Sequence, residues 1–200
     1  MGCALLFHEV CPCLLAASAA YDAETQRAAK AMETKLEILG KNDAPLRPGV
    51  RPVIVTEHEA NCYLKIHSGE FLPPGVDTPV LTATPEHITA SGDVDFNVLS
   101  RSYPNPNDWG PKILAAMFKG KQHVTVTGRF QSEDRGTRLE IESVVVGPLT
   151  VPSWLVDYFV ENVLGPRYGI DLSKPFPYPD HVTRIVVGVK QATFLRGKRQ

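Results

Sequence analysis

Residues 87–98 read HITASGDVDFNV, an alternation of polar and apolar residues that holds over the whole stretch. A strict period of two is typical of a β-strand with one apolar and one polar face. At about 3.3 Å per residue, such a strand would be roughly 35–40 Å long. Because one face is polar and suited to solvent and the other is apolar, the pattern predicts an antiparallel sheet rather than a parallel sheet covered on both sides.

The same pattern appears on both sides of this stretch. Leu81–Ala83 leads through the turn Thr84-Pro85-Glu86 into it. Further along, apolar residues alternate again at Val124, Val126, Gly128 and Phe130. The turn 133–136 then predicts a hairpin onto a third strand, whose inward positions are Leu139, Ile141 and Ser143.

Helices are predicted on either side of these strands. Asp22 is a candidate N-cap for a helix to Leu39, with a core stripe at Ala29, Met32, Leu36 and Leu39. After a Pro/Gly-rich linker and a short strand at 53–55, Thr56 and Glu59 have the spacing of a capping box, and that helix should run to about His67. Two further helices are expected, one capped by Asp108 and one by Ser153.

Pro175, Pro177 and Pro179 predict an extended segment that leads into a last strand, about Val182 to Phe194. The chain is therefore expected to be α+β. Residues 21–52, a helix and linker, should form one unit with the sheet-rich segment 53–195. A chain of 200 residues fits such a domain.

The first twenty residues differ in composition from the rest. They hold no Lys or Arg, and the apolar run from Leu14 leads into Ser18-Ala19-Ala20, small residues of the kind that precede a cleavage site. Residues 1–20 are therefore interpreted as an imperfect signal peptide, which predicts a periplasmic or secreted protein. Of the four cysteines, only Cys62 lies outside this segment, which leaves no internal disulfide after cleavage.

The sequence carries no catalytic signature, and the protein is expected not to be an enzyme. Asp93 with Asp95, or Glu140 with Glu142, share a strand face, but solvated strand faces explain them better than a cation does. No metal or cofactor is expected. The net charge of −1 predicts no nucleic-acid partner.

Gly92 and Gly128 occupy mid-strand positions on the apolar face. A glycine there weakens a strand and usually marks bending or the close approach of another element. One interpretation is a helix packed tightly against a coiled sheet. The other is space left for an apolar guest.

The order of elements resembles that of secreted bacterial proteins with a tubular, TULIP-like lipid-binding fold, the LmeA-like and YceB-like families. The similarity covers about Val53 to Phe194. It rests on the helix opening at 53–59, the alternating strands, the proline-led apolar helix at 151–156 and the proline run into 182–185. The resemblance implies a long, strongly curved antiparallel sheet wrapped on a long helix with short accessory helices, and an apolar groove for acyl chains.

We therefore expect an exported, non-enzymatic protein that binds a lipid or other apolar small molecule, with peripheral contact to a membrane. The expected ligand-binding residues are Gly92, Val94, Phe96, Val126, Gly128, Phe130, Trp154, Leu155, Phe159 and Phe194. One alternative is a structural or adaptor domain of the envelope with a filled core. A second is a hydrolase with a dispersed site, in which Ser91 or Ser143 would need a nearby histidine.

Overall fold

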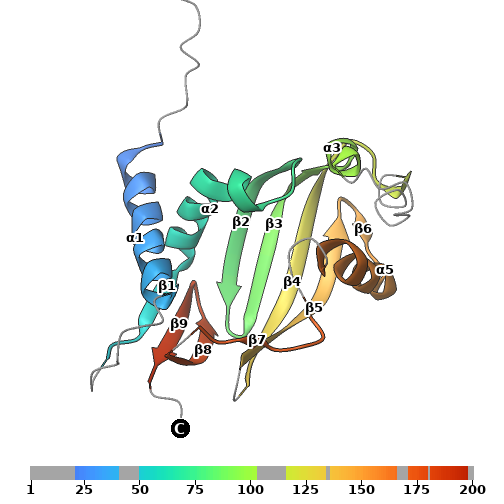
Figure 1. Cartoon of the computed structure of the whole chain (residues 1–200). Coiled ribbons are helices and arrows are strands. Elements are labelled where there is room, and N and C mark those ends of the chain that lie inside the picture. Colours follow the sequence, from blue (N-terminus) through green and yellow to red (C-terminus); the bar gives the residue numbers. More distant parts are fainter. Residues whose placement is uncertain are drawn as a thin grey trace, which may run out of the picture.

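The computed structural model describes residues 21–40, 50–102, 116–133, 136–165, 171–179 and 181–197. The described chain is α+β and holds a large open antiparallel sheet, a small second sheet and a few helices (Figure 1). The predicted fold class and the antiparallel pairing are confirmed. The expected signal segment, the cap Asp108 and the turn residues 134 and 135 lie outside the described residues.

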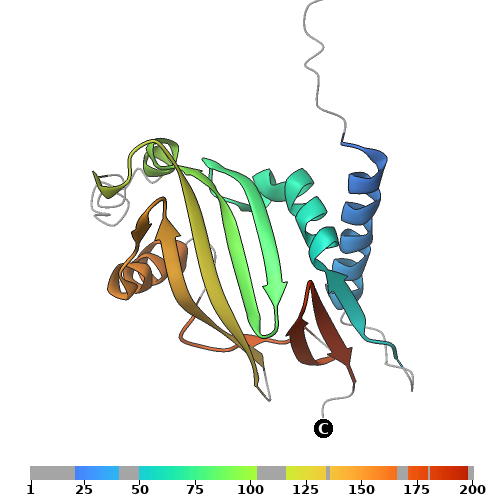
Figure 2. The same cartoon turned by 180° about the vertical axis from the view of Figure 1, so that it is seen from behind.

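The large sheet runs in the order β2-β3-β4-β5-β6, and each pair of neighbours is antiparallel. Its strands are β2 (Val76–Thr84), β3 (His87–Asp95), β4 (Lys121–Glu133), β5 (Gly136–Val146) and β6 (Leu149–Thr150). Helix α5 lies over one face, and the view from behind shows no described helix across the other face (Figure 2). This arrangement matches the alternation of apolar and polar residues along the strands.

The predicted twelve-residue strand is shorter than expected. β3 ends at Asp95, and α3 (Phe96–Arg101) begins directly after it. The Asp95 carboxylate accepts hydrogen bonds from the backbone N–H groups of Asn97 and Val98, so it acts as an N-cap. The strand therefore ends at the N-cap although the alternation continues in the sequence, and Phe96 and Val98 are helical residues.

A β-bulge in β5 changes which of its residues face the apolar side of the sheet, and this differs from the prediction. Thr127 pairs with Ser143, whereas the next residue, Gly128, pairs with Ile141, so Glu142 is an extra residue on β5. Beyond the bulge the alternation is reversed, and Val144 shares the apolar face with its partner Val126. Ser143 therefore lies on the opposite face, contrary to the prediction.

The small sheet has the order β1-β9-β8. The predicted single strand from Val182 to Phe194 is wrong: it is a hairpin of β8 (Val182–Gly188) and β9 (Gln191–Arg196). β1 (Val53–Thr56) pairs with β9, and Lys190 in the hairpin turn has a positive φ of 55°. The proline run is extended as expected, and it contributes β7 (Phe176–Pro177), which pairs with β5.

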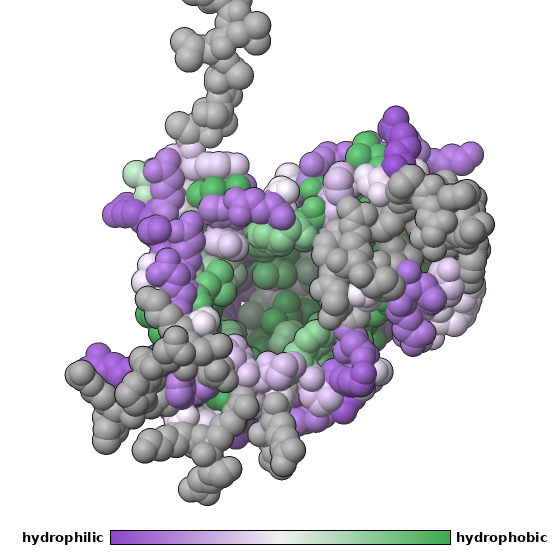
Figure 3. Space-filling view, viewed as in Figure 1, coloured by the Kyte–Doolittle hydropathy of each residue, from purple (hydrophilic) through white to green (hydrophobic). Residues whose placement is uncertain are grey.

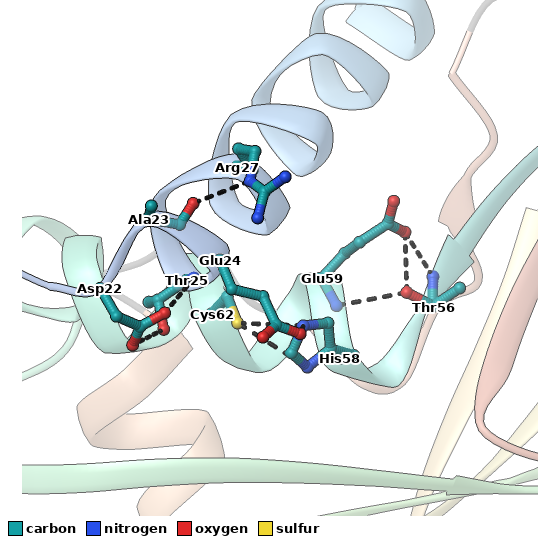
Figure 4. Close-up of polar contacts among 9 residues, drawn as sticks. All are labelled: Asp22, Ala23, Glu24, Thr25, Arg27, Thr56, His58, Glu59 and Cys62. Atoms are coloured by element: carbon teal, nitrogen blue, oxygen red, sulfur yellow. Dashed lines mark hydrogen bonds and ion pairs between the residues drawn. The ribbon is translucent and has the colours of Figure 1, made fainter.

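Both predicted N-caps of the first two helices are confirmed (Figure 4). In α1 (Ala23–Gly40), the Thr25 N–H donates to the Asp22 carboxylate at 2.8 Å. In α2 (Glu57–Phe71), Thr56 and Glu59 form the complete capping box. α2 runs four residues further than predicted, and Leu36 of the predicted core stripe on α1 is 40% exposed.

The proline-led helix is α5 (Ser153–Phe159), and it continues as the π-helical turn η1 (Val160–Leu164). Its N-cap is Pro152, which has no side-chain cap, so the predicted cap Ser153 is the first helical residue instead. α5 packs on the large sheet through a buried cluster: Phe96, Leu99, Phe118, Val146, Val151 and Leu155. A second cluster under the small sheet holds Leu39, Val53, Tyr178 and Val182.

Candidate apolar ligand cavity

The floor of the candidate site is one face of the large sheet. The register aligns inward residues across the three central strands. Val94 shares a face with Gly92, which pairs with Val124, and Val126 pairs with Val144. Six residues of these strands line a common cavity: Val94, Val124, Val126, Ile141, Val144 and Val146. The β-bulge is what brings the last two onto this face.

The roof of the cavity is α5 with η1. Leu155, Val156, Phe159 and Val160 face the sheet, and Val151 precedes the helix. The backbone N–H of Val151 donates to the Val144 carbonyl at 2.8 Å, which ties the start of the helix to the floor. Phe96 and Leu99 of α3 close one side, and Pro73 and Val76 contribute from the start of β2.

The cavity has a volume of about 260 Å³, and every described residue that lines it is apolar. A dry cavity of about 150 Å³ lined by Leu, Ile and Phe is large enough to bind benzene. The volume here lies near the lower end of ordinary ligand pockets, roughly 300–1,000 Å³. Figure 3 shows hydrophobic side chains gathered in a hollow on this side of the molecule.

The two ends of the cavity differ in burial. At the end near α3, Phe96 is 5% and Leu155 is 1% exposed, so this end is sealed by packed side chains. Further along the strands, Val126, Ile141 and Val144 are only half-buried although they lie on the inward face. Val126 and Ile141 are not packed against the buried cluster and face the open part of the cavity, whereas Val144 also packs against that cluster.

Half of the predicted ligand-binding residues lie at this cavity. Its walls include Val94, Phe96, Val126, Leu155 and Phe159, whereas Gly92, Gly128, Phe130, Trp154 and Phe194 do not line it. Trp154 points away, with 60% exposure, and Phe194 packs against the second core cluster. The sequence analysis missed Val144 and Val146, because a strict alternation without the bulge places them on the polar face. No pattern in the sequence indicated that Pro73 and Val76 line the cavity.

Neither glycine makes room for a guest or for a helix. A Cβ on Gly92 would lie 3.0 Å from the Asp77 carbonyl oxygen, because β2 is irregular there and its backbone comes close. A Cβ on Gly128 would lie 2.8 Å from Cδ1 of Leu139 on the next strand. Both positions thus accept the close approach of a neighbouring strand.

The polar side chains gather on the other face of the sheet. There His87 lies 3.3 Å from Glu142, which also binds Arg129 at 3.0 Å, and His123 lies 3.0 Å from Asp93. Ser91 and Ser143 lie on this polar face as well. Within the described residues, no hydrogen bond joins either serine to a histidine.

A third group lies between α1 and α2. The Cys62 sulfur is 3.8 Å from Nε2 of His58, and His58 is 3.7 Å from Glu24 (Figure 4). Cys62 is buried, and its sulfur is almost equally far from both ring nitrogens, which is not the geometry of a directed hydrogen bond. No three His, Cys, Asp or Glu side chains of the described chain are placed to hold a metal ion.

Across the described residues, no helix combines the length and the apolar character needed to cross a bilayer. Comparison with protein-family models, curated proteins and solved structures finds no match for this chain.

Proposed function

We propose that the chain is an exported binding protein that holds a lipid or other apolar molecule in the bacterial envelope and catalyses no reaction. The observation that carries this proposal is the cavity of about 260 Å³ between the sheet and α5–η1, whose lining is apolar throughout the described residues. Burial of a hydrocarbon there would release about 0.8 kcal/mol per methylene. A wall without donors or acceptors selects by size and shape and not by hydrogen bonding.

The position of the cavity also supports the proposal. It lies between the alternating strands and the proline-led helix at 151–156, two of the four features on which the resemblance to tubular lipid-binding proteins rests. The strong curvature of the sheet and its wrapping on a long helix are part of the same proposal. So is export, which rests on the composition of residues 1–20.

Contact with a membrane surface would give the protein access to its ligand. Trp154 on the roof helix α5 is 60% exposed, and Leu149 on β6, the strand that precedes this helix, is 52% exposed. Exposed Trp and Leu side chains can insert into the interfacial region of a bilayer. These two residues support transient membrane contact during loading.

Of the two alternatives, the cavity weighs against a structural domain with a filled core, because such a domain would fill the space next to Val126 and Ile141 with side chains. The hydrolase alternative needs a nucleophile and a base at the site. Ser91 and Ser143 lie instead on the face opposite the cavity. The binding protein is therefore the function that the geometry supports best.

The proposal is tested by native mass spectrometry on protein purified from its host without detergent, together with titration of cis-parinaric acid, a fluorescent fatty acid. We expect an adduct with the mass of an apolar molecule, and saturable uptake with one probe per chain. A bare protein mass together with no saturable uptake would refute the proposal.

A further inference from the structure

We infer that the cavity takes a single hydrocarbon tail of about ten carbons and leaves the polar head group of the ligand in solvent. This inference rests on the proposed function and specifies its ligand. Three properties carry it: the volume of the cavity, the absence of polar side chains from its described lining, and its one sealed end.

The volume sets the number of carbons. A cavity of about 150 Å³ accommodates benzene, which corresponds to roughly 25 Å³ per carbon atom. On that scale the volume of about 260 Å³ holds about ten carbons. The two tails of a membrane phospholipid hold far more carbons than this, so they cannot both be buried here.

The lining determines where the head group lies. The fifteen described side chains that line the cavity are all apolar, from Pro73 to Val160, and none of them can pair with a charge or a hydroxyl group. Burying an unpaired polar group costs several kcal/mol, and burying an unpaired charge costs far more. Only the hydrocarbon part of an amphiphile can therefore enter.

The burial gradient sets the direction of entry. The end at Phe96 and Leu155 is sealed, whereas Val126, Ile141 and Val144 are partly open. A tail that enters methyl end first would stop at Phe96 and Leu155, with its head group beyond Ile141. Because no described wall residue contacts the head group, its charge should have little influence on affinity.

The experiment is a competition series against cis-parinaric acid with hexanoic, octanoic, decanoic, dodecanoic and hexadecanoic acid, each below its micelle concentration. We expect affinity to rise about fourfold per methylene as far as decanoic acid and to level off beyond it. Decyltrimethylammonium should bind within about threefold of decanoate, because its head group would be as free as the carboxylate.

The outcomes separate this inference from the proposed function. If no acid of any length competes and the probe itself does not bind, the proposed function fails. If affinity keeps rising to hexadecanoic acid, or if the two decyl compounds differ more than tenfold, the protein is a binder but the single short tail is wrong. A two-chain phospholipid that binds more tightly than decanoate would overturn the inference as well.

Discussion

The side-chain amide of Asn61 on α2 pairs with the backbone of Leu81 on β2 as a neighbouring strand would. The Leu81 N–H donates to Oδ1 of Asn61 at 2.6 Å, and Nδ2 of Asn61 donates to the Leu81 carbonyl at 2.8 Å. Glu57 adds a third bond by accepting from the Ala83 N–H at 2.9 Å. α2 thereby covers an edge strand whose free backbone groups would otherwise invite pairing with another chain.

Replacing Asn61 by Ala should therefore destabilise the protein. Leu81 would lose both partners at a half-buried position, which costs about 1–3 kcal/mol. Urea unfolding measures the change, and size-exclusion chromatography should show more self-association. Asn162→Ala is the matched control, because Asn162 is exposed and, among the described residues, its amide bonds only to Tyr158 of the same helical segment. Its effect should stay within about 0.5 kcal/mol. Equal effects of the two changes would contradict this role for Asn61.

Thr56→Ala should cost about 1 kcal/mol, the usual scale for the loss of an N-cap. The Thr56 hydroxyl accepts from the Glu59 N–H at 3.2 Å, and that amide would lose its partner. Thr56→Ser keeps the hydroxyl and should restore most of the stability. If both variants melt at the temperature of the wild type, the cap contributes nothing to the free energy of unfolding.

Glu59 links stability to pH. Burial alone would raise its pKa, but hydrogen bonds from Lys35 and Thr56 outweigh burial and lower the pKa below the ordinary value of 4.5. The stabilisation from ionised Glu59 is therefore complete above about pH 4.5 and is lost as the pH falls through the lowered pKa.

Glu59→Gln tests this linkage, because Gln can still complete the capping box but cannot pair with Lys35, whose Nζ lies 2.5 Å from the carboxylate. The variant should be less stable than the wild type by about 1–2 kcal/mol at pH 7. The difference should shrink when the pH is lowered below about 4. A difference that stays constant down to pH 2 would rule out the charge as its origin.

Two glycines should respond in opposite directions to replacement by Ala. At Gly92, the new Cβ would lie 3.0 Å from the backbone oxygen of Asp77, so Gly92→Ala should destabilise the protein. Gly69 lies inside α2, and beyond its chain neighbours and its own helix backbone no described atom lies within 4 Å of the new Cβ. Gly69→Ala should therefore stabilise the protein by about 0.5–1 kcal/mol. Thermal melts of the two variants provide the comparison, and a shift of the same sign in both would contradict it.

Local structure was predictable where the residues fitted a single pattern. The caps Asp22 and Thr56 and the hairpin through Pro85 were read correctly, because each depends on a few adjacent residues. The end of β3 was misread because Asp95 fits a strand face and an N-cap equally well. Only tertiary pairing decides between the two.

The cavity was harder to predict because it, too, depends on how the strands pair in the folded protein. The inward positions of Val94 and Val126 were predictable from alternation alone. The inward position of Val144 depends on the bulge at Glu142, and no residue in the sequence there indicates a bulge. The hairpin of β8 and β9 was missed because Val189 and Lys190 are not typical turn residues. The effect of Gly92 depends on a backbone distance to β2 that the sequence does not encode locally.

The claim that the interior is hollow and takes a ligand is tested most directly by one pair of neighbouring substitutions. Val144 lines the cavity, and Val145 points to the opposite face of the same strand, where it pairs with Thr125. Val144→Phe adds four carbons to the cavity wall, and Val145→Phe adds the same four outside it.

The measurement is the dissociation constant for cis-parinaric acid, with the melting temperature taken on the same samples. We expect Val144→Phe to weaken binding at least tenfold with a melting temperature equal to or above that of the wild type, since filling a cavity does not strain the fold. Val145→Phe should bind as the wild type does. Unchanged binding by Val144→Phe, or a loss of about 1–3 kcal/mol from overpacking in that variant, would contradict the hollow interior.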